Sequence, residues 1–304
     1  MPTFAQGSRS SLAFGVQADF DTVATSFTNL PIKTHSLDVT KERLQGQDIQ
    51  SDRMPRVDRH GNKNAAGSIE IDLRKGNYDD FLESALLSSF NSSDELTVGT
   101  TPKYLTIEDR LEDISQFRLF TGMTVGTLNV SIAPNQMVET SFDMVGKSGT
   151  ISGTGKTVSA STINSPFDSY NGAIYEGGVG SGDLINLVTS ISFSVTNAFA
   201  PTFVVGSDVA PALEYGRSTI EGTLSVYAEN ATLINKFLNE TESEIQVSVD
   251  DPTGANPYTF YFPRVKYNGA PIPLANEQSR FIEMPFVALY DSVEGTQMKI
   301  TRTS

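Results

Sequence analysis

The chain has 304 residues, 38% of them hydrophobic, and a formal net charge of −14, so it is long and apolar enough to bury a substantial core. It contains no cysteine, which excludes disulfides, thiolate metal sites and cysteine nucleophiles. With 22 basic against 36 acidic side chains, a surface that grips phosphate backbones is disfavoured.

The start of the chain, MPTFAQGSRSSLAFG, lacks the basic and then apolar pattern of a signal sequence. No run approaches the roughly 20 apolar residues that span a bilayer. We therefore expect synthesis in a cytoplasm and no membrane partner.

The first half of the chain predicts strands and one short helix. SLDVT at residues 36–40 and GSIEIDL at residues 67–73 both alternate apolar and polar side chains, which is typical of half-buried strands. A long loop separates them. Phe81, Leu82 and Ala85 then share one helical stripe, and a polar stretch follows at residues 88–102.

The second half repeats this order. SFSVT at residues 192–196 matches SLDVT, and Phe237 matches Phe81, both with an offset of 156. The later match of Phe286 to Phe142 has an offset of 144, which one deletion of the stretch at 88–102 explains. We interpret the pattern as a tandem duplication, with chance resemblance between alternating strands as the alternative.

Residues 146–166, rich in glycine, serine and threonine, predict a linker or long loop between the halves. We therefore expect one unit at residues 1–165, with an N-terminal arm and a long loop, and a second at 166–304. The fold class is mainly β: two tandem related β-sandwich or split-barrel units, each with one short α-helix. So short a helix cannot cover two sheet faces, which predicts that other copies of the chain bury the remaining strand edges.

This order of elements resembles the major tail tube proteins of long-tailed bacteriophages, the siphophages. The resemblance rests on Phe14-Gly15-Val16, the strand, loop and strand around Gly67, the helix, and the closing segments FPRVKYNG and EMPFVALYD. It implies a non-enzymatic virion protein that stacks as rings into a tube for DNA delivery. Because single-unit members form hexamers, a duplicated chain implies homotrimeric rings with pseudo-sixfold symmetry.

The resemblance also implies a location in the phage tail. The expected partners are further copies of the chain, the tape measure, tail-tip and terminator proteins, and DNA in transient, non-specific passage. Another phage structural protein or a β-sandwich adhesin remains an alternative, as does an enzyme on two β domains.

Along each strand of a channel wall, buried apolar side chains should alternate with acidic or small polar side chains that face the water. GSIEIDL and MVETSFDM have this pattern, and the repeat adds one further carboxylate, so the channel-lining candidates are Glu70, Asp72, Glu139, Asp143 and Glu283. A solvated outer strand face explains the same alternation equally well.

Residues 53–63 form the densest basic segment of this acidic chain. Their place in the long loop predicts a contact with an acidic surface of the next ring, with Arg53, Arg56, Arg59 and Lys63 as candidates. A solvated, mobile loop is the alternative.

No motif predicts catalysis, a cofactor or a metal. Gly153-Thr154-Gly155-Lys156-Thr157 resembles part of a phosphate-binding loop, but Thr150 stands where its first glycine is needed and no helical pattern follows. The two histidines, His35 and His60, are too few for a histidine metal cluster.

Overall fold

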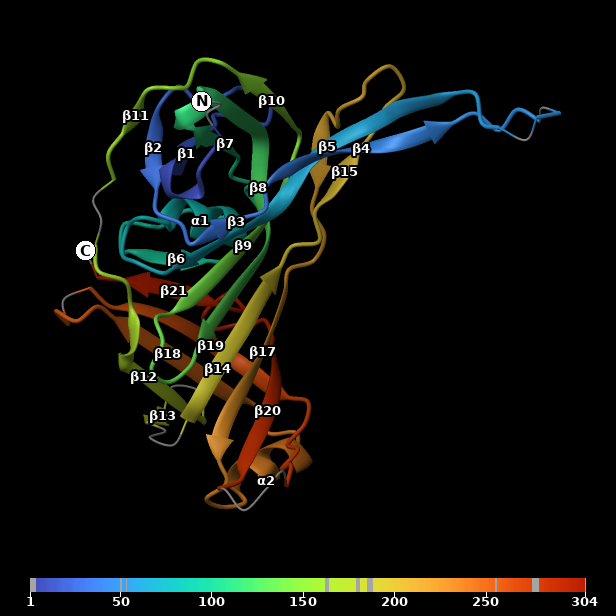
Figure 1. Ribbon diagram of the computed structural model, residues 1–304. Coiled ribbons are helices and arrows are strands. Elements are labelled where there is room, and N and C mark those ends of the chain that lie inside the picture. The colour runs from blue at the N-terminus through green and yellow to red at the C-terminus, as the bar shows by residue number, and fades with distance from the viewer. Residues whose placement is uncertain are drawn as a thin grey trace.

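The computed structural model describes residues 4–49, 51–52, 54–161, 164–178, 181–184, 188–254, 256–274 and 279–303. Strands dominate it, and the two helices are short (Figure 1). Neither helix in these ranges is long and apolar enough to cross a membrane.

The described residues of the first half form eleven strands and helix α1. Their bounds are β1 (Ser10–Val16), β2 (Phe27–Leu30), β3 (Thr34–His35), β4 (Asp38–Gln45), β5 (Asp58–Asp72), α1 (Asp79–Leu86), β6 (Glu95–Thr97), β7 (Leu105–Leu111), β8 (Gln116–Ile132), β9 (Glu139–Gly146), β10 (Ser148–Ser152) and β11 (Val158–Ser159). Short 3-10 turns lie at Gly7–Arg9 and Glu112–Ile114.

In the second half, the part of the chain that the structure describes forms ten strands and helix α2. Their bounds are β12 (Asp168–Gly178), β13 (Ser181–Leu184), β14 (Val188–Thr196), β15 (Ala200–Thr202), β16 (Ala212–Glu214), β17 (Thr219–Tyr227), α2 (Thr232–Leu238), β18 (Ser243–Asp250), β19 (Tyr258–Tyr267), β20 (Phe281–Ala288) and β21 (Lys299–Arg302).

The strands pair in the same order in both halves. In the first, neighbours run β1, β7, β8, β9, β5 and β4. In the second, they run β12, β18, β19, β20, β17 and β14. Helix α1 follows β5 and helix α2 follows β17, and these two strands hold the same place in the two orders. One pairing order therefore occurs twice along the chain.

The halves are joined by backbone pairing. β14 runs antiparallel to the second part of β8, from Ile191 opposite Ile132 to Thr196 opposite Thr127. A continuous sheet of eight strands therefore crosses the molecule in the order β4, β5, β9, β8, β14, β17, β20, β19 (Figure 1).

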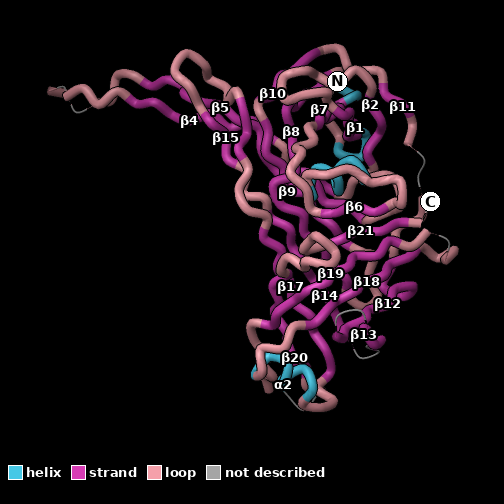
Figure 2. The backbone as a smooth tube through the Cα atoms, turned by 180° about the vertical axis from the view of Figure 1, so that it is seen from behind, coloured by secondary structure: helices cyan, strands magenta, loops and turns pink. Residues whose placement is uncertain are grey.

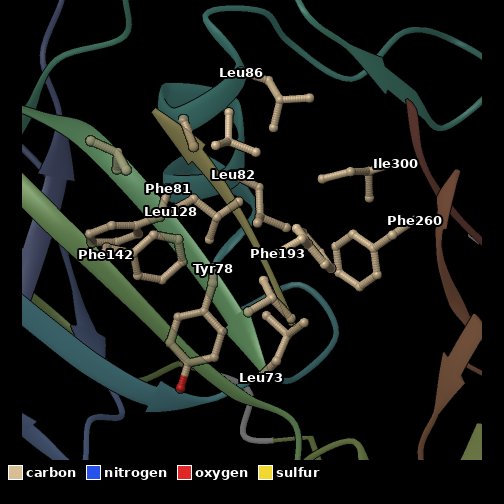
Figure 3. Close-up of a cluster of buried hydrophobic side chains, with 14 of the residues drawn as sticks. Leu73, Tyr78, Phe81, Leu82, Leu86, Leu128, Phe142, Phe193, Phe260 and Ile300 are labelled. Atoms are coloured by element: carbon tan, nitrogen blue, oxygen red, sulfur yellow. The ribbon is translucent and has the colours of Figure 1, made fainter. Parts of the chain in front are cut away.

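The apolar side of this sheet and helix α1 form the core (Figure 3). Phe81 on α1 lies 5.2 Å from Phe142 on β9 and 5.0 Å from Phe14 on β1, measured between ring centroids. Asp79 and Asp80 occupy the first turn of α1, where the positive end of the helix dipole favours carboxylates. The helix ends at Leu87, which is left-handed with φ 52°.

Residues 146–166 differ from a plain linker, because they contain β10 and β11, which pair with β8 and β2. The glycines there allow close packing: a Cβ on Gly149 would lie 2.6 Å from Val39 Cγ2, and one on Gly155 would lie 2.6 Å from Phe117 Cε1. Glycine content in this segment therefore reflects crowding against neighbouring strands.

The β4–β5 hairpin projects well beyond the body of the molecule, and the β15–β16 hairpin runs beside it (Figures 1 and 2). A parallel bridge joins Lys63 to Val209, and the Lys63 amide donates to the Asp208 carbonyl at 2.8 Å. Helix α2 lies at the far end of the molecule from these hairpins (Figure 1).

Candidate functional site

One face of the eight-stranded sheet is polar across its width. Side chains pointing to this face alternate with core residues such as Ile69, Phe142 and Phe193, because the strand period is two. The register aligns one row of polar residues from strand to strand: Glu70, Ser141, Asn129, Ser194 and Glu221. A neighbouring row holds Asp72, Glu139, Ser131, Ser192 and Thr223.

This polar face is hollowed, with a cavity of about 670 Å³. Strands of both halves line the cavity, mostly through serine, threonine, asparagine and glutamate side chains. The polar side chains of this lining offer small polar groups and negative charge to whatever lies against the face.

The five channel-lining candidates all lie on this face. Glu70 and Glu139 line the hollow, Asp72 stands opposite Glu139, Asp143 opposite Ser68, and Glu283 opposite Ser225. Sequence reasoning missed Glu221, although the alternation in TIEGTLSVY carries the same signal. It also missed Lys33, which lies two residues after Pro31 and outside any alternating run.

Lys33 is held by two carboxylates. Its Nζ donates to Glu139 Oε1 at 2.7 Å and lies 3.4 Å from Asp72 Oδ1. The hydrogen bond to Glu139 is the main cause that raises the pKa of Lys33, and Asp72 adds to it. This cation therefore stays charged and is neutralised locally, which leaves Glu70, Asp143, Glu221 and Glu283 to give the face a net negative charge.

The basic hairpin segment is largely paired inside the chain. Arg56 forms an ion pair with Asp52, and Lys63 Nζ lies 2.8 Å from Asp208 Oδ2 on the neighbouring hairpin. The hydrogen bond from Lys63 is the main cause that lowers the pKa of Asp208. Arg59 is exposed, and Arg53 lies outside the described residues.

The same hairpin also exposes apolar side chains that sequence reasoning missed. Ile49 and Met54, near the tip, are 99% and 66% exposed, and Leu44 and Val57 stand where the paired strands end. Apolar groups gathered on a protruding hairpin are typical of a contact surface.

Over the described ranges, no three His, Asp or Glu side chains gather where a metal ion could bind. His35 Nε2 lies 3.5 Å from Asp109 Oδ1, and His60 is exposed on β5.

A continuous sheet with a polar hollow face, exposed edges and a projecting hairpin defines a β-protein suited to association through its strands. The family model described as phage tail tube protein matches residues 7–288, and the chain belongs to this family. No curated protein matches the chain. The family match confirms the resemblance drawn from the sequence and identifies a structural component of the phage tail tube, in preference to an adhesin or an enzyme.

Proposed function

We propose that three copies of this chain close into a ring, and that the rings stack into a tail tube whose acidic channel carries DNA to the host. The main support for this ring is the β8–β14 junction between the two halves. The chain exposes two further strand edges, which could form the same junction between two copies.

The first of these edges belongs to β19. β8 pairs with β9 and β10 on one side and with β7 and then β14 on the other. β19 pairs with β20 and β21 on one side and with β18 on the other. Past Val265, the β18 side of β19 has no partner strand among the described residues. This open stretch of β19 consists of Lys266 and Tyr267. β14 joins β8 on the same side, from Thr127 onward, past the last pair with β7 at Met123.

The second edge belongs to β3 and β4. Both strands pair with β5, as β14 pairs with β17, and their outer edge has no partner strand in the part of the chain that the structure describes. Pairing between the outer edge of β4 and the open edge of β19 in the next copy repeats the β8–β14 junction and leaves no open edge in a closed ring.

Ring closure by three copies of the eight-stranded segment gives a barrel of about 24 strands, which is wider than barrels of about 16 to 18 strands that already enclose an aqueous channel. Six repeats of one pairing order around that barrel give pseudo-sixfold symmetry. The repeated strand order supports the proposed duplication, with units at residues 1–165 and 166–304.

In this arrangement the polar face lines the channel. Glu70, Asp143 and Glu221 on this face repel a phosphate backbone, and the small hydroxyl side chains between them offer few apolar contacts to bases. The wall thereby lowers friction for passing DNA without binding it.

Stacking is assigned to the β4–β5 hairpin. Because Arg56 and Lys63 already have carboxylate partners, the apolar tip residues supply contact area on the next ring, and exposed Arg59 supplies charge complementarity. The tube meets the tape measure, tail-tip and terminator proteins in the virion, after synthesis in the cytoplasm of the host bacterium.

The test is mass measurement of the purified protein as it assembles, with electron microscopy of the product. We expect species of three chains that stack into hollow tubes. Rings of six chains would overturn the proposed duplication, and a chain that stays monomeric at high concentration, even with tail-tip complexes added, would overturn the tube function.

A further inference from the structure

Helix α1 is held at both ends by the second half of the chain. At its N-terminus, Arg302 on β21 forms an ion pair with Asp79, and the Tyr258 hydroxyl donates to Asp79 at 2.5 Å. At its C-terminal turn, Asn197, directly after β14, donates through Nδ2 to the Ala85 carbonyl at 2.7 Å. The helix therefore belongs to the junction between the halves as much as to its own unit.

The face of α1 is covered as well. Leu82 and Leu86 point toward Phe193 of β14 and Ile300 of β21 (Figure 3). Leu82 and Leu86 are fully buried by these contacts and their neighbours. Side chains of the second half thus complete the packing of a helix from the first.

Helix α2 is covered less completely. Leu233, Ile234 and Phe237 pack against the core but are only half-buried, and Leu238 is 67% exposed. The apolar area that remains exposed on α2 favours a partner, since burying such side chains is the main favourable term in association.

The repeated strand order indicates which surface of a second copy could cover α2 in the way that β14 and β21 cover α1. β4 corresponds to β14, because each is the last strand in its pairing order. β10 corresponds to β21, because β10 follows β9 along β8 as β21 follows β20 along β19. At the corner between β4 and β10, Ile151 is 66% exposed and Val39 is half-buried over Gly149. Lys41 follows SLDVT as Asn197 follows SFSVT, and it is exposed.

We propose that α2 of one copy docks on the β4–β10 corner of the next copy and so stabilises the contact between neighbouring chains of the ring. This inference rests on the proposed ring. Leu238 and its apolar neighbours pack against Ile151 and Val39. Lys41 takes the role of Asn197 at the C-terminal turn of the helix, where a cation is favoured by the helix dipole.

Cross-linking tests this contact directly, because the chain has no native cysteine. The full-length double variant Leu238→Cys/Ile151→Cys is assembled and treated with a short bismaleimide. We expect covalent dimers and trimers in assembled samples and none in dilute monomer. The matched control pairs Leu238→Cys with Tyr170→Cys, since Tyr170 is 91% exposed on β12, and it should give no ladder.

Two failures are distinguishable. If microscopy shows three-chain rings but the Leu238→Cys/Ile151→Cys pair does not cross-link, the docking of α2 is wrong and the ring proposal stands. If no rings form in the unsubstituted protein, both fall. A ladder as strong in the control pair would also overturn the contact.

A second variant avoids dependence on cross-linker reach. Leu238→Lys changes a side chain that is exposed in the single chain, so its folding should be unaffected. We expect the concentration needed for ring formation to rise roughly tenfold, since burial of a leucine side chain is lost. Val293→Lys, at 84% exposure in the loop after β20, should leave this concentration unchanged, and an equal effect of the two variants would contradict the contact.

Discussion

At the scale of single residues, Arg302 joins the two halves. It pairs with Asp79 and with Asp94, its Nε lies 2.9 Å from Asp94 Oδ1, and its guanidinium lies 4.1 Å from the ring centroid of Phe90. Burial raises the pKa of Asp79 above its ordinary value, although Tyr258 and Arg302 counteract it. The charged form of Asp79 is therefore tolerated because these partners surround it.

We predict that Arg302→Ala lowers the free energy of unfolding by roughly 2–4 kcal/mol at neutral pH, since a partly buried carboxylate loses its cation. A carboxyl whose pKa is raised by folding contributes stability below its unfolded pKa and loses it as pH rises through the folded value. Removing Arg302 raises that pKa further. The loss of unfolding free energy caused by Arg302→Ala should therefore grow between about pH 4 and pH 7, as denaturant titrations at both pH values would show.

The surface pair of Lys266 and Glu240 is the matched control, because Lys266→Ala removes an ion pair whose carboxylate is fully exposed. That variant should change stability little at either pH. A deficit of Arg302→Ala that shrinks as pH rises would contradict the role given to Asp79.

Gly222 shows how tightly the polar sheet is packed beneath its wet face. A Cβ at this position would lie 2.5 Å from Phe286 Cζ and 2.6 Å from the Ser192 carbonyl oxygen. We predict that Gly222→Ala costs about 1–3 kcal/mol through overpacking, measured by thermal or denaturant unfolding. At Gly153 the nearest such atom is the Ser115 carbonyl oxygen at 4.0 Å, so Gly153→Ala should be close to neutral.

At the scale of elements, the β4–β5 hairpin is separable from the fold. Regular pairing of its strands ends at Gln45 opposite Asp58, and none of the described residues of the tip beyond them belongs to the buried core. We predict that replacing residues 46–57 by Asn-Gly leaves the unfolding free energy of the chain nearly unchanged and still permits single rings. Stacking into tubes should be lost. Tubes of normal length from this variant, seen by electron microscopy, would contradict the stacking role.

Alternation and helical periodicity predicted many of these elements from sequence. The strands around Ile69, Phe142 and Val247 and the helix around Phe81 have patterns that local chemistry determines. Strand β21 and the strands in residues 146–166 could not be found this way, because their register is set by partners far along the chain. The pairing of Lys63 with Asp208 likewise depends on how the two hairpins fold beside each other.

At the scale of the whole molecule, the alternating carboxylates were predictable as a face, while the assembly of six described strands from both halves into one hollow was not. We predict that tubes carrying Glu70→Lys, Asp143→Lys and Glu221→Lys retain duplex DNA, with binding that weakens steeply as salt rises, whereas unsubstituted tubes do not bind it. Co-sedimentation of tubes with DNA at two salt concentrations would measure this.

The control reverses exposed carboxylates on other elements, for example Glu112→Lys with Glu214→Lys. DNA retention in this control at the same level as in the channel variant would show that overall charge, and not the polar face, decides the outcome.

In the proposed ring, the β8–β14 junction recurs between neighbouring chains. Electron cryomicroscopy of the assembled tube tests it most directly, because it resolves which strands are neighbours across the chain boundary. We predict three chains per ring, with β19 of one copy hydrogen-bonded along β4 of the next and the face of Glu70 and Glu221 turned to the channel. A ring in which β19 or β4 keeps an open edge, or in which that face is turned outward, would contradict the account.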